Sequence, residues 1–466
     1  MERFALRYGS TVVYMGEGAL SGLQRHLGAH RRILIVKGRR SAEESGALND
    51  ALEVVQRLGI SAETYSGISP NPTDSMVDGI VEAVRAHGAE AILAIGGGSV
   101  IDSAKFAAVI ACSGGRADDY LLGGRTPSCD MPVYAVNLTH GTGSEIDRYS
   151  VANVEGKGLK IGLETTYPRA SADDPRYLRS LPADQTIYTG LDALYHALES
   201  STSTETNRMT QTLAREAVEL IARWLPAALR SPGDLEARGN LLYAAAVAGI
   251  AIDNSVTHIV HLLEHVLSGI NPRLPHGAGL AMLGPRCIRY TYAARPIEGA
   301  LVMRALDPGL EPIPEHAERA EEALRRFQES LGFDEGLSDY GFSEGELEGL
   351  RARAMEILRG ETGLVPFEVT EEIVGDIISS AFRGRGDCAD GSRAIRMRAG
   401  PATGRRGIIS IVLLNFGYIM SSHLTTPEAT ASSNLGMRRS TALMVAFVTS
   451  HTDLWPSSPQ SLSMNE

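Results

Sequence analysis

The chain has 466 residues, of which 43% are hydrophobic and 21% are charged, and its formal net charge at pH 7 is -12. This length accommodates two or three domains with separate cores, and the acidic balance argues against a protein that binds nucleic acid through a basic surface. No uninterrupted run reaches the roughly 18–20 apolar residues that a membrane-spanning helix needs, so we expect no membrane span.

The cysteines and the N-terminal sequence favour a cytoplasmic protein. The four cysteines, Cys112, Cys129, Cys287 and Cys388, are widely spaced and form no Cys-x-x-Cys pair. This argues against a disulfide scaffold or a thiolate zinc site and fits a reducing compartment. The first residues, MERFALRYGSTVVYMG, contain no uninterrupted apolar core of the kind that a secretory signal has.

The first part of the chain alternates short apolar strands with amphipathic helices. We predict helices over 41–58 and over 73–88, the second capped by Thr73, and a further helix that opens after residue 96. Such alternation is typical of a parallel sheet covered by helices on both faces, and it predicts a Rossmann-like α/β domain over residues 1–179. The predicted strands are 32–38, 61–67, 91–95 and 132–138.

From about residue 180 the pattern changes to long runs with helical periodicity and good helix formers. We predict an all-helical domain over 180–384, joined to the first by the proline-bearing segment SADDPRYLRSLP. Residues 385–466 are rich in Arg, Gly, Ser and Pro and are expected to form a poorly ordered C-terminal extension. The clearest helical runs are 185–200, 207–228, 235–252 and 257–268.

Two loops rich in Gly, Ser and Thr follow successive predicted strands: GGGSVIDSAK at 96–105 and THGTGSE at 139–145. Glycines let a backbone approach a ligand closely, and the start of a helix offers free N–H groups to an anion. The first loop lacks the G-x-G-x-x-G fingerprint, but its position predicts a pyrophosphate cradle at the carboxyl ends of the strands. The candidate contacts are Gly97, Gly98, Ser99, Asp102, Thr139 and Thr142.

One aspartate and three histidines form a candidate metal site. Asp192 and His196 are four residues apart and share one face of a predicted helix. His261 lies on a second helical run, and His276 opens a third after the Asn271–Pro272 break. A carboxylate and three imidazoles can hold one Fe²⁺ or Zn²⁺ ion with a coordination position left open for a substrate.

Spacing alone leaves the membership of this set open. An Asp-x-x-x-His pair more often forms a surface contact or a helix cap than a metal site. His258, His261 and His265 also share one helical stripe, on which at least one could be an ordinary packed histidine.

With these motifs in place, the chain resembles the iron-containing (group III) alcohol dehydrogenase family from about residue 5 to 383. Any one motif could arise by chance, but six occur in the family's order and at near-family spacing. They are SPNPT (69–73), GGGSVIDSAK (96–105), THGTGSE (139–145), DPRYLRSLP (174–182), TGLDALYHALE (189–199) and HLLEHVLSG…PHGAGLA (261–281).

The resemblance implies a dehydroquinate synthase-like architecture, in which a dinucleotide-binding α/β domain faces a helical domain, and it implies a homodimer. His265 matches a residue near the substrate that is often assigned to proton transfer. Asn71 and Lys160 match the cofactor site, with Lys160 near the nicotinamide ribose. The implied metal ligands are Asp192, His196, His261 and His276.

The chain departs from the family pattern in three places. The interval from His261 to His276 is one residue longer than in many members, which a loop absorbs easily. His140 stands where many members have a small residue or threonine, so the local cofactor contact is expected to differ. The segment after about residue 384 has no family counterpart.

The cofactor preference follows from one position. Relatives that prefer NAD often place an acidic residue after the first strand, whereas this chain has Gly38 followed by Arg39 and Arg40. A guanidinium can pair with a 2′-phosphate, so we expect NADP(H) to be favoured over NAD(H). The alternative is that both arginines simply face solvent.

We therefore expect a metal-dependent NAD(P)(H) alcohol dehydrogenase that acts on a small alcohol or aldehyde. The main alternative is a metal- and NAD-dependent lyase like dehydroquinate synthase, although that enzyme uses a different ligand set that includes a glutamate. A metal-free branch such as maleylacetate reductase is disfavoured because all four ligands are present. A third alternative is a non-catalytic binding or structural protein, which would be favoured only if the purified chain bound neither metal nor dinucleotide.

Overall fold

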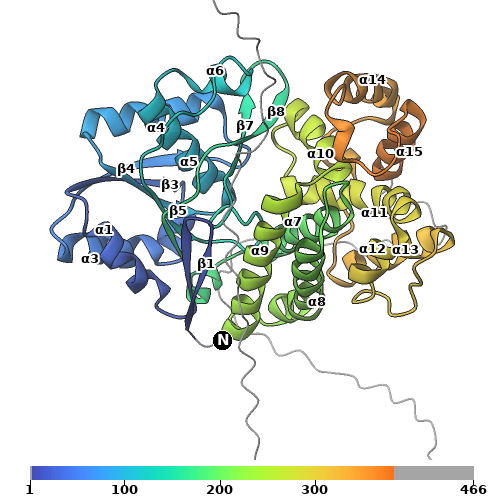
Figure 1. The fold of residues 1–466 in the computed structure, drawn as a ribbon, viewed down its shortest axis with the longest axis horizontal. Helices are drawn as coiled ribbons and strands as arrows, with labels where there is room; N and C mark the ends of the chain where they lie inside the picture. The colour runs from blue at the N-terminus through green and yellow to red at the C-terminus, as the bar shows by residue number, and fades with distance from the viewer. Residues whose placement is uncertain (1–2, 383–466) are drawn as a thin grey trace, which may run out of the picture. The chain divides into compact units, whose positions relative to one another are not determined.

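The computed structural model describes residues 3–382. The predicted extension over 385–466 and Cys388 lie outside these residues. Strands lie in the first half of the described chain, and from α7 onward it contains only helices and connections (Figure 1). The predicted fold class, a Rossmann-like α/β part followed by an all-α part, is confirmed.

A seven-stranded sheet forms the first half, with the order β1-β2-β9-β6-β5-β3-β4. All neighbouring strands pair in parallel except β1 and β2, which form an antiparallel hairpin at one edge. A separate antiparallel pair, β7 (Tyr149–Val154) and β8 (Leu159–Glu164), follows β6 in the chain. The strands of the main sheet are β1 (Phe4–Tyr8), β2 (Thr11–Met15), β3 (Arg32–Gly38), β4 (Ser61–Ile68), β5 (Ala91–Gly96), β6 (Val133–Asn137) and β9 (Ala170–Asp173).

Helices cover both faces of this sheet because successive residues of a strand point to opposite sides. Ile33 and Ile35 of β3 pack into one core with α3, whereas Leu34 and Val36 pack into the other core with α4 and α5. The predicted helix over 41–58 is divided in two, because Gly46 takes a left-handed φ of 82°. The helices of this half are α1 (Gln24–Leu27), α2 (Ser41–Glu44), α3 (Ala47–Arg57), α4 (Asp74–His87), α5 (Gly98–Ser113) and α6 (Ala117–Leu121).

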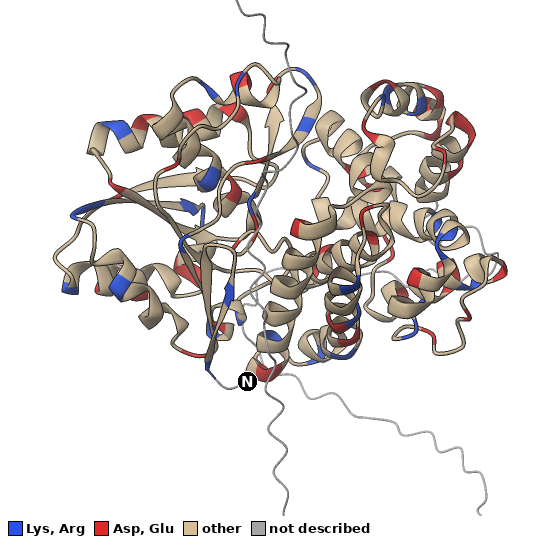
Figure 2. Ribbon diagram, viewed as in Figure 1, with Lys and Arg blue, Asp and Glu red and all other residues tan. Residues whose placement is uncertain are grey.

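The second half packs its helices around one large apolar core. Outer helices carry both signs of charge (Figure 2), with exposed pairs such as Arg326–Glu322 that contribute little to stability. The predicted boundary at residues 179/180 lies between β9 and α7 and stays a prediction. The helices are α7 (Ala183–Thr202), α8 (Arg208–Arg230), α9 (Leu235–Ser255), α10 (Ile259–Ile270), α11 (His276–Ala294), α12 (Pro296–Met303), α13 (Ala317–Ser330), α14 (Leu347–Ile357) and α15 (Glu371–Phe382).

Short 3₁₀ helices complete the described chain. They are η1 (Ala19–Leu23), η2 (Pro175–Leu178), η3 (Pro314–His316), η4 (Leu337–Tyr340), η5 (Glu344–Glu346) and η6 (Thr362–Leu364).

Helix α9 joins the two halves. Leu241, Ala245 and Ala248 pack into the helical core, while Leu242 and Ala246 pack into the core beneath the sheet. A helix with cores on two sides must be apolar nearly all round. This explains why α9 is the one described helix long and apolar enough to cross a membrane, although 78% of that apolar window is buried within the protein.

The structure also contains a disulfide between Cys112, near the end of α5, and Cys129, with the two Cα atoms 5.6 Å apart. The cysteine spacing did not predict this bond. It is the one disulfide within the described residues, and Cys287 is buried as a free thiol. This single cross-link lies beside three large apolar cores.

The contact between α9 and the 139–145 loop yields a stability prediction. Gly249 lies directly on Gly143, and a Cβ on Gly249 would lie 2.9 Å from the Gly143 Cα. Such overpacking costs about 1–3 kcal/mol, more than the roughly 0.5–1 kcal/mol that alanine gains over glycine within a helix. We expect Gly249→Ala to lower the free energy of unfolding in urea by about 1 kcal/mol.

Gly233→Ala is the control, because a Cβ there meets no heavy atom within 4 Å. Equal free energies of unfolding for the Gly249 variant and the unmodified protein would contradict the proposed close packing.

Candidate active site

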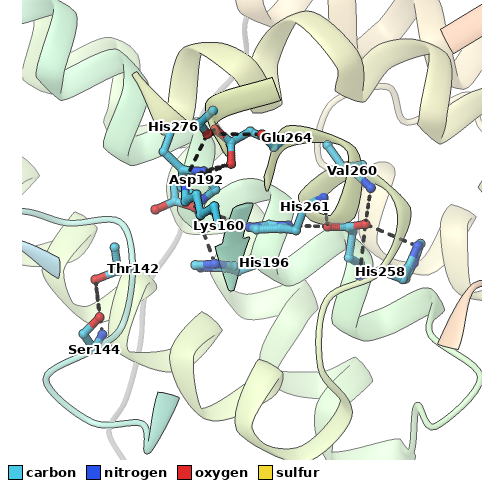
Figure 3. Close-up of polar contacts among 12 residues, drawn as sticks. Thr142, Ser144, Lys160, Asp192, His196, His258, Val260, His261, Glu264 and His276 are labelled. Carbon is cyan, nitrogen blue, oxygen red and sulfur yellow. Dashed lines mark hydrogen bonds and ion pairs between the residues drawn. The ribbon is translucent and has the colours of Figure 1, made fainter. Parts of the chain in front are cut away.

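Three helices bring the predicted metal ligands to one point (Figure 3). Asp192 and His196 lie one turn apart on α7, His261 lies in the first turn of α10, and His276 is the first residue of α11. The Nε2 atoms of the three histidines lie 3.4, 3.6 and 3.7 Å from Oδ1 of Asp192. The structure thus brings together all four residues that the sequence nominated.

The spacing of these atoms fits a divalent ion better than a hydrogen-bonded cluster. Distances of 3.4–3.7 Å exceed those of normal N–H···O hydrogen bonds, whereas two atoms each about 2.1 Å from a tetrahedral ion lie about 3.4 Å apart. Within residues 3–382, Asp192 Oδ1 and His261 Nε2 are buried and have no hydrogen-bond partner. The donor set therefore fits Fe²⁺ or Zn²⁺.

Two buried carboxylates orient His261 and His276 through the ring nitrogens that face away from Asp192. Glu199 contacts Nδ1 of His261, and Glu264 contacts Nδ1 of His276. A proton shared along each contact stays on the Nδ1 side and leaves the Nε2 lone pair free to face Asp192. Glu199 also accepts a 2.7 Å hydrogen bond from the backbone N–H of Val260, which fixes the start of α10.

Charge keeps Glu199 ionised despite its burial. Burial raises the pKa of this carboxyl, but its electrostatic interactions with His258 and His261 and its hydrogen bonds outweigh burial and bring the pKa to about 2. Glu199 and Glu264 were not predicted from the sequence as residues of the site. For Glu199 a signal was present, since it lies seven residues after Asp192 and so on the same face of α7.

Lys160 and Asn71, both predicted cofactor contacts, meet beside this site. Lys160, on β8, donates to Oδ1 of Asn71 at 3.0 Å and pairs with Glu264 at 3.1 Å. The amide nitrogen of Asn71 donates to the carbonyls of Pro272 and Leu274 at 3.0 Å each. Asn71 takes a positive φ of 53°, which asparagine tolerates better than most residues. These contacts tie the α/β half to the loop that precedes His276.

The two glycine loops pack on each other at the carboxyl ends of β5 and β6. A Cβ on Gly97 would lie 2.6 Å from the side chain of Thr139, and one on Gly98 would collide with Thr142. Gly97 caps α5, so the free N–H groups of the first helical turn point out at this edge beside half-buried Ser99.

Asp102, one turn further along α5, is buried instead. Its carboxylate accepts a 3.0 Å hydrogen bond from the Val151 N–H and lies 3.7 Å from Nζ of Lys105. Burial raises the pKa of Asp102. These contacts connect α5 to β7.

Gly38 ends β3 as a buried residue and Arg39 follows as an exposed one. Arg40 is also exposed, and its guanidinium lies 3.5 Å from Glu44. Lys37, which no sequence motif marks, has a buried side chain that pairs with Glu43 at 2.6 Å.

His258 and His265, the other two histidines of the α10 stripe, lie in different environments. His258 is fully buried and bonds to Thr202 at 3.0 Å, which makes it a packed residue. His265 is half-buried, and its ring centre lies 5.6 Å from that of His276. Burial, followed by the positive charge of Lys160, lowers the pKa of His265.

Comparisons with known proteins identify the family of the chain. Residues 10–175 match the family described as "Iron-containing alcohol dehydrogenase", and residues 186–382 match "Fe-containing alcohol dehydrogenase family, C-terminal". The chain belongs to the iron-containing alcohol dehydrogenase family. This family implies a metal and a nicotinamide cofactor, and the chain is an NAD(P)-dependent alcohol dehydrogenase, not a dehydroquinate synthase-like lyase.

The chain matches its relatives over nearly their whole length. The long-chain primary alcohol dehydrogenase AdhA of Thermoanaerobacter ethanolicus is 34% identical over 389 residues, which is 81% of this chain and 97% of the relative. The 1,3-propanediol dehydrogenase of Citrobacter freundii is 30% identical over 80% of this chain and 97% of the relative. The crystal structure of NADH-dependent butanol dehydrogenase A from Thermotoga maritima matches with a TM-score of 0.74 and 25% identity, over 81% and 98% of the two chains.

The carboxylates behind the histidines yield a prediction. We expect Glu199→Gln to lower metal affinity by about 10- to 100-fold, because a neutral amide no longer fixes the charge and orientation of His261. Metal bound after titration with a chelator measures this directly.

Glu321→Gln is the matched control, since Glu321 is also a buried carboxylate but pairs with Arg286 and Arg325 away from the site. An equal metal affinity in both variants would rule out an orienting role for Glu199.

Proposed function

We propose that Asp192, His196, His261 and His276 hold one Fe²⁺ or Zn²⁺ ion at which a primary alcohol or its aldehyde exchanges hydride with a nicotinamide cofactor. The observation that carries the proposal is the convergence of three Nε2 atoms on Oδ1 of Asp192. Among the described residues, this oxygen and Nε2 of His261 are buried and lack a hydrogen-bond partner. When bound, such an ion supplies Lewis acidity to the substrate oxygen.

The residues of the chain provide positioning and exclude water. Asp192 is ionised, because burial raises its pKa less than the interactions with the neighbouring histidines lower it. Glu199 and Glu264 hold two imidazoles in the tautomer that presents Nε2. The ligand atoms therefore need little rearrangement when the cation binds.

We infer that the cofactor lies along the carboxyl edge of the sheet. The start of α5, with Gly97, Gly98 and Ser99, provides N–H groups for the pyrophosphate. Thr139 and Thr142 flank it, and Asn71 and Lys160 face the nicotinamide end. The contact between Gly141 and α7, where a Cβ would lie 3.0 Å from Oδ2 of Asp192, supports this placement because it puts the loop beside the metal ligands.

His265 is proposed to carry the proton between the substrate oxygen and water. Its imidazole adjoins His276 and, within the described residues, forms none of the side-chain hydrogen bonds that hold His258 and His261. The substrate class follows from the relatives, whose names specify long-chain primary alcohols, 1,3-propanediol and butanol. Assembly as a homodimer and a cytoplasmic location stay predictions from the sequence.

Two histidine variants should separate metal binding from proton transfer. His261→Ala removes a ligand, so we expect it to lose the metal and nearly all turnover. His265→Ala should keep one metal per chain and lose about 10²- to 10⁴-fold in kcat, the usual contribution of general acid–base catalysis. Metal analysis alongside aldehyde-dependent NADPH oxidation measures both, and a His261→Ala enzyme that keeps metal and turnover would contradict the assignment.

The cofactor preference is proposed to favour NADP(H). Gly38 offers no carboxylate to repel a 2′-phosphate, and the exposed Arg39 guanidinium is next to it. We expect Arg39→Ala to raise the KM for NADPH by about 10-fold through the lost charge-assisted hydrogen bond, with little change for NADH.

Arg57→Ala, which removes the same charge from the exposed surface of α3, is the control. Similar KM values for NADH and NADPH in the unmodified enzyme would refute this preference.

A further inference from the structure

His140 belongs to the cofactor loop, yet its side chain lies inside the protein. It is fully buried, between α7 and α9. Its Nε2 lies 3.2 Å from Nη1 of Arg238 on α9, and its Nδ1 lies 3.2 Å from Oγ1 of Thr189 on α7. The expected difference in the local cofactor contact stays a prediction, and the ring of His140 is bonded to two helices of the other half.

The direction of every hydrogen bond in this network is determined. Arginine can only donate, so Nε2 of His140 must accept and the ring proton must lie on Nδ1. Nδ1–H then donates to Thr189, whose hydroxyl donates to the carbonyl of Gln185 at 2.8 Å. Burial, and then the charge of Arg238, lowers the pKa of His140 to about 3, which agrees with a neutral ring.

Arg238 is a buried cation held by neutral groups. Its side chain is almost completely buried, and it donates to Thr186 at 2.9 Å and to the Pro232 carbonyl at 3.2 Å. Within residues 3–382 no carboxylate lies within 4.0 Å of its guanidinium. Burying a charge without a counter-ion is costly. The neutral acceptors of Arg238, His140 included, therefore contribute more to stabilising its charge than they would beside an ion-paired arginine.

The residue after His140 lies directly on α7. A Cβ on Gly141 would lie 2.9 Å from the Thr189 carbonyl oxygen and 3.0 Å from Oδ2 of Asp192. Thr139 and Thr142, on either side, pack on the glycines that begin α5. The loop thus contacts the proposed cofactor cradle and the proposed metal ligand within four residues.

We propose that His140, held by Arg238, is a positioning residue that locks the 139–142 loop onto α7 and so sets the distance between the nicotinamide cofactor and the metal ligands. This inference rests on the proposed cofactor and metal sites. It assigns His140 no contact with substrate, cofactor or metal.

The test combines variants at both ends of the network. Thr189→Val removes the acceptor of the His140 N–H with almost no change in shape, and His140→Ala and Arg238→Met remove the bonds on either side. We expect each to raise the Kd for NADPH, followed by its fluorescence, by about 5- to 30-fold, the loss of one or two buried hydrogen bonds. Metal content should stay at the level of the unmodified enzyme.

Two further readouts separate positioning from general stability. Loss of His140 and Arg238 together should cost no more affinity than the worse single variant, since both act through one network. His140→Gln, whose amide can both accept and donate, should recover part of the affinity. His30→Ala is the control, because His30 bonds to Tyr134 at 2.9 Å near the amino end of β6, at the opposite end of the strand from the 139–142 loop, and its loss should lower stability without changing Kd.

An unchanged NADPH Kd in both Thr189→Val and His140→Ala would overturn the inference, as would equal Kd changes in these variants and in His30→Ala. Failure of the proposed function looks different. In that case the Thr142→Val variant would bind NADPH as tightly as the unmodified enzyme, or the unmodified enzyme would contain no metal.

Discussion

Unshared lone pairs that face one another inside the protein are the constraint on which the rest of the site depends. Oδ1 of Asp192 lies 3.4–3.7 Å from three imidazole Nε2 atoms. These distances are too long for normal hydrogen bonds but match the spacing of ligands around one metal ion. A cation would resolve this arrangement, and without one Oδ1 of Asp192 and Nε2 of His261 are buried with no hydrogen-bond partner among the described residues, at the cost of lost hydration. The packing of helices α7, α10 and α11 brings these four ligand atoms together at one place. Glu199 and Glu264 maintain this arrangement because they hold the ring protons of His261 and His276 on Nδ1, away from Asp192.

The second constraint is that this point lies where the two halves of the protein meet. Helix α9 contributes to the core beneath the sheet and to the helical core, so the halves share buried surface. Polar contacts reinforce it: Lys160 reaches Glu264, Asn71 reaches the loop before His276, and His140 reaches α7 and α9. The fold itself can therefore fix the distance between the proposed cofactor site at the edge of the sheet and the proposed metal ligands on the helices.

Much of this arrangement could be predicted from the sequence because it rests on local patterns. The predicted strand over 32–38 has the bounds of β3, since a run of apolar residues bounded by turns is a strong signal for a buried strand. The i,i+4 spacing of Asp192 and His196 placed them on one helical face, and the glycine loops followed their strands as expected.

Other features depend on packing that periodicity does not encode. Strand β9 is four residues long and carries polar Ser171 and Asp173 inside the sheet, so no apolar run marks it. The inward turn of His140 from a loop rich in Gly and Thr depends on Arg238, which lies 98 residues away. The choice of Glu199 and Glu264 as partners of particular histidines likewise depends on how three helices meet.

The most direct test of the central claim is an anomalous difference map from crystals of the enzyme loaded with Fe²⁺ or Zn²⁺, recorded at the absorption edge of the metal. We predict one peak per chain, about 2.0–2.2 Å from the Asp192 carboxylate and from Nε2 of His196, His261 and His276. A peak elsewhere, or an enzyme that is fully active and shows no peak at these four residues, would contradict the account.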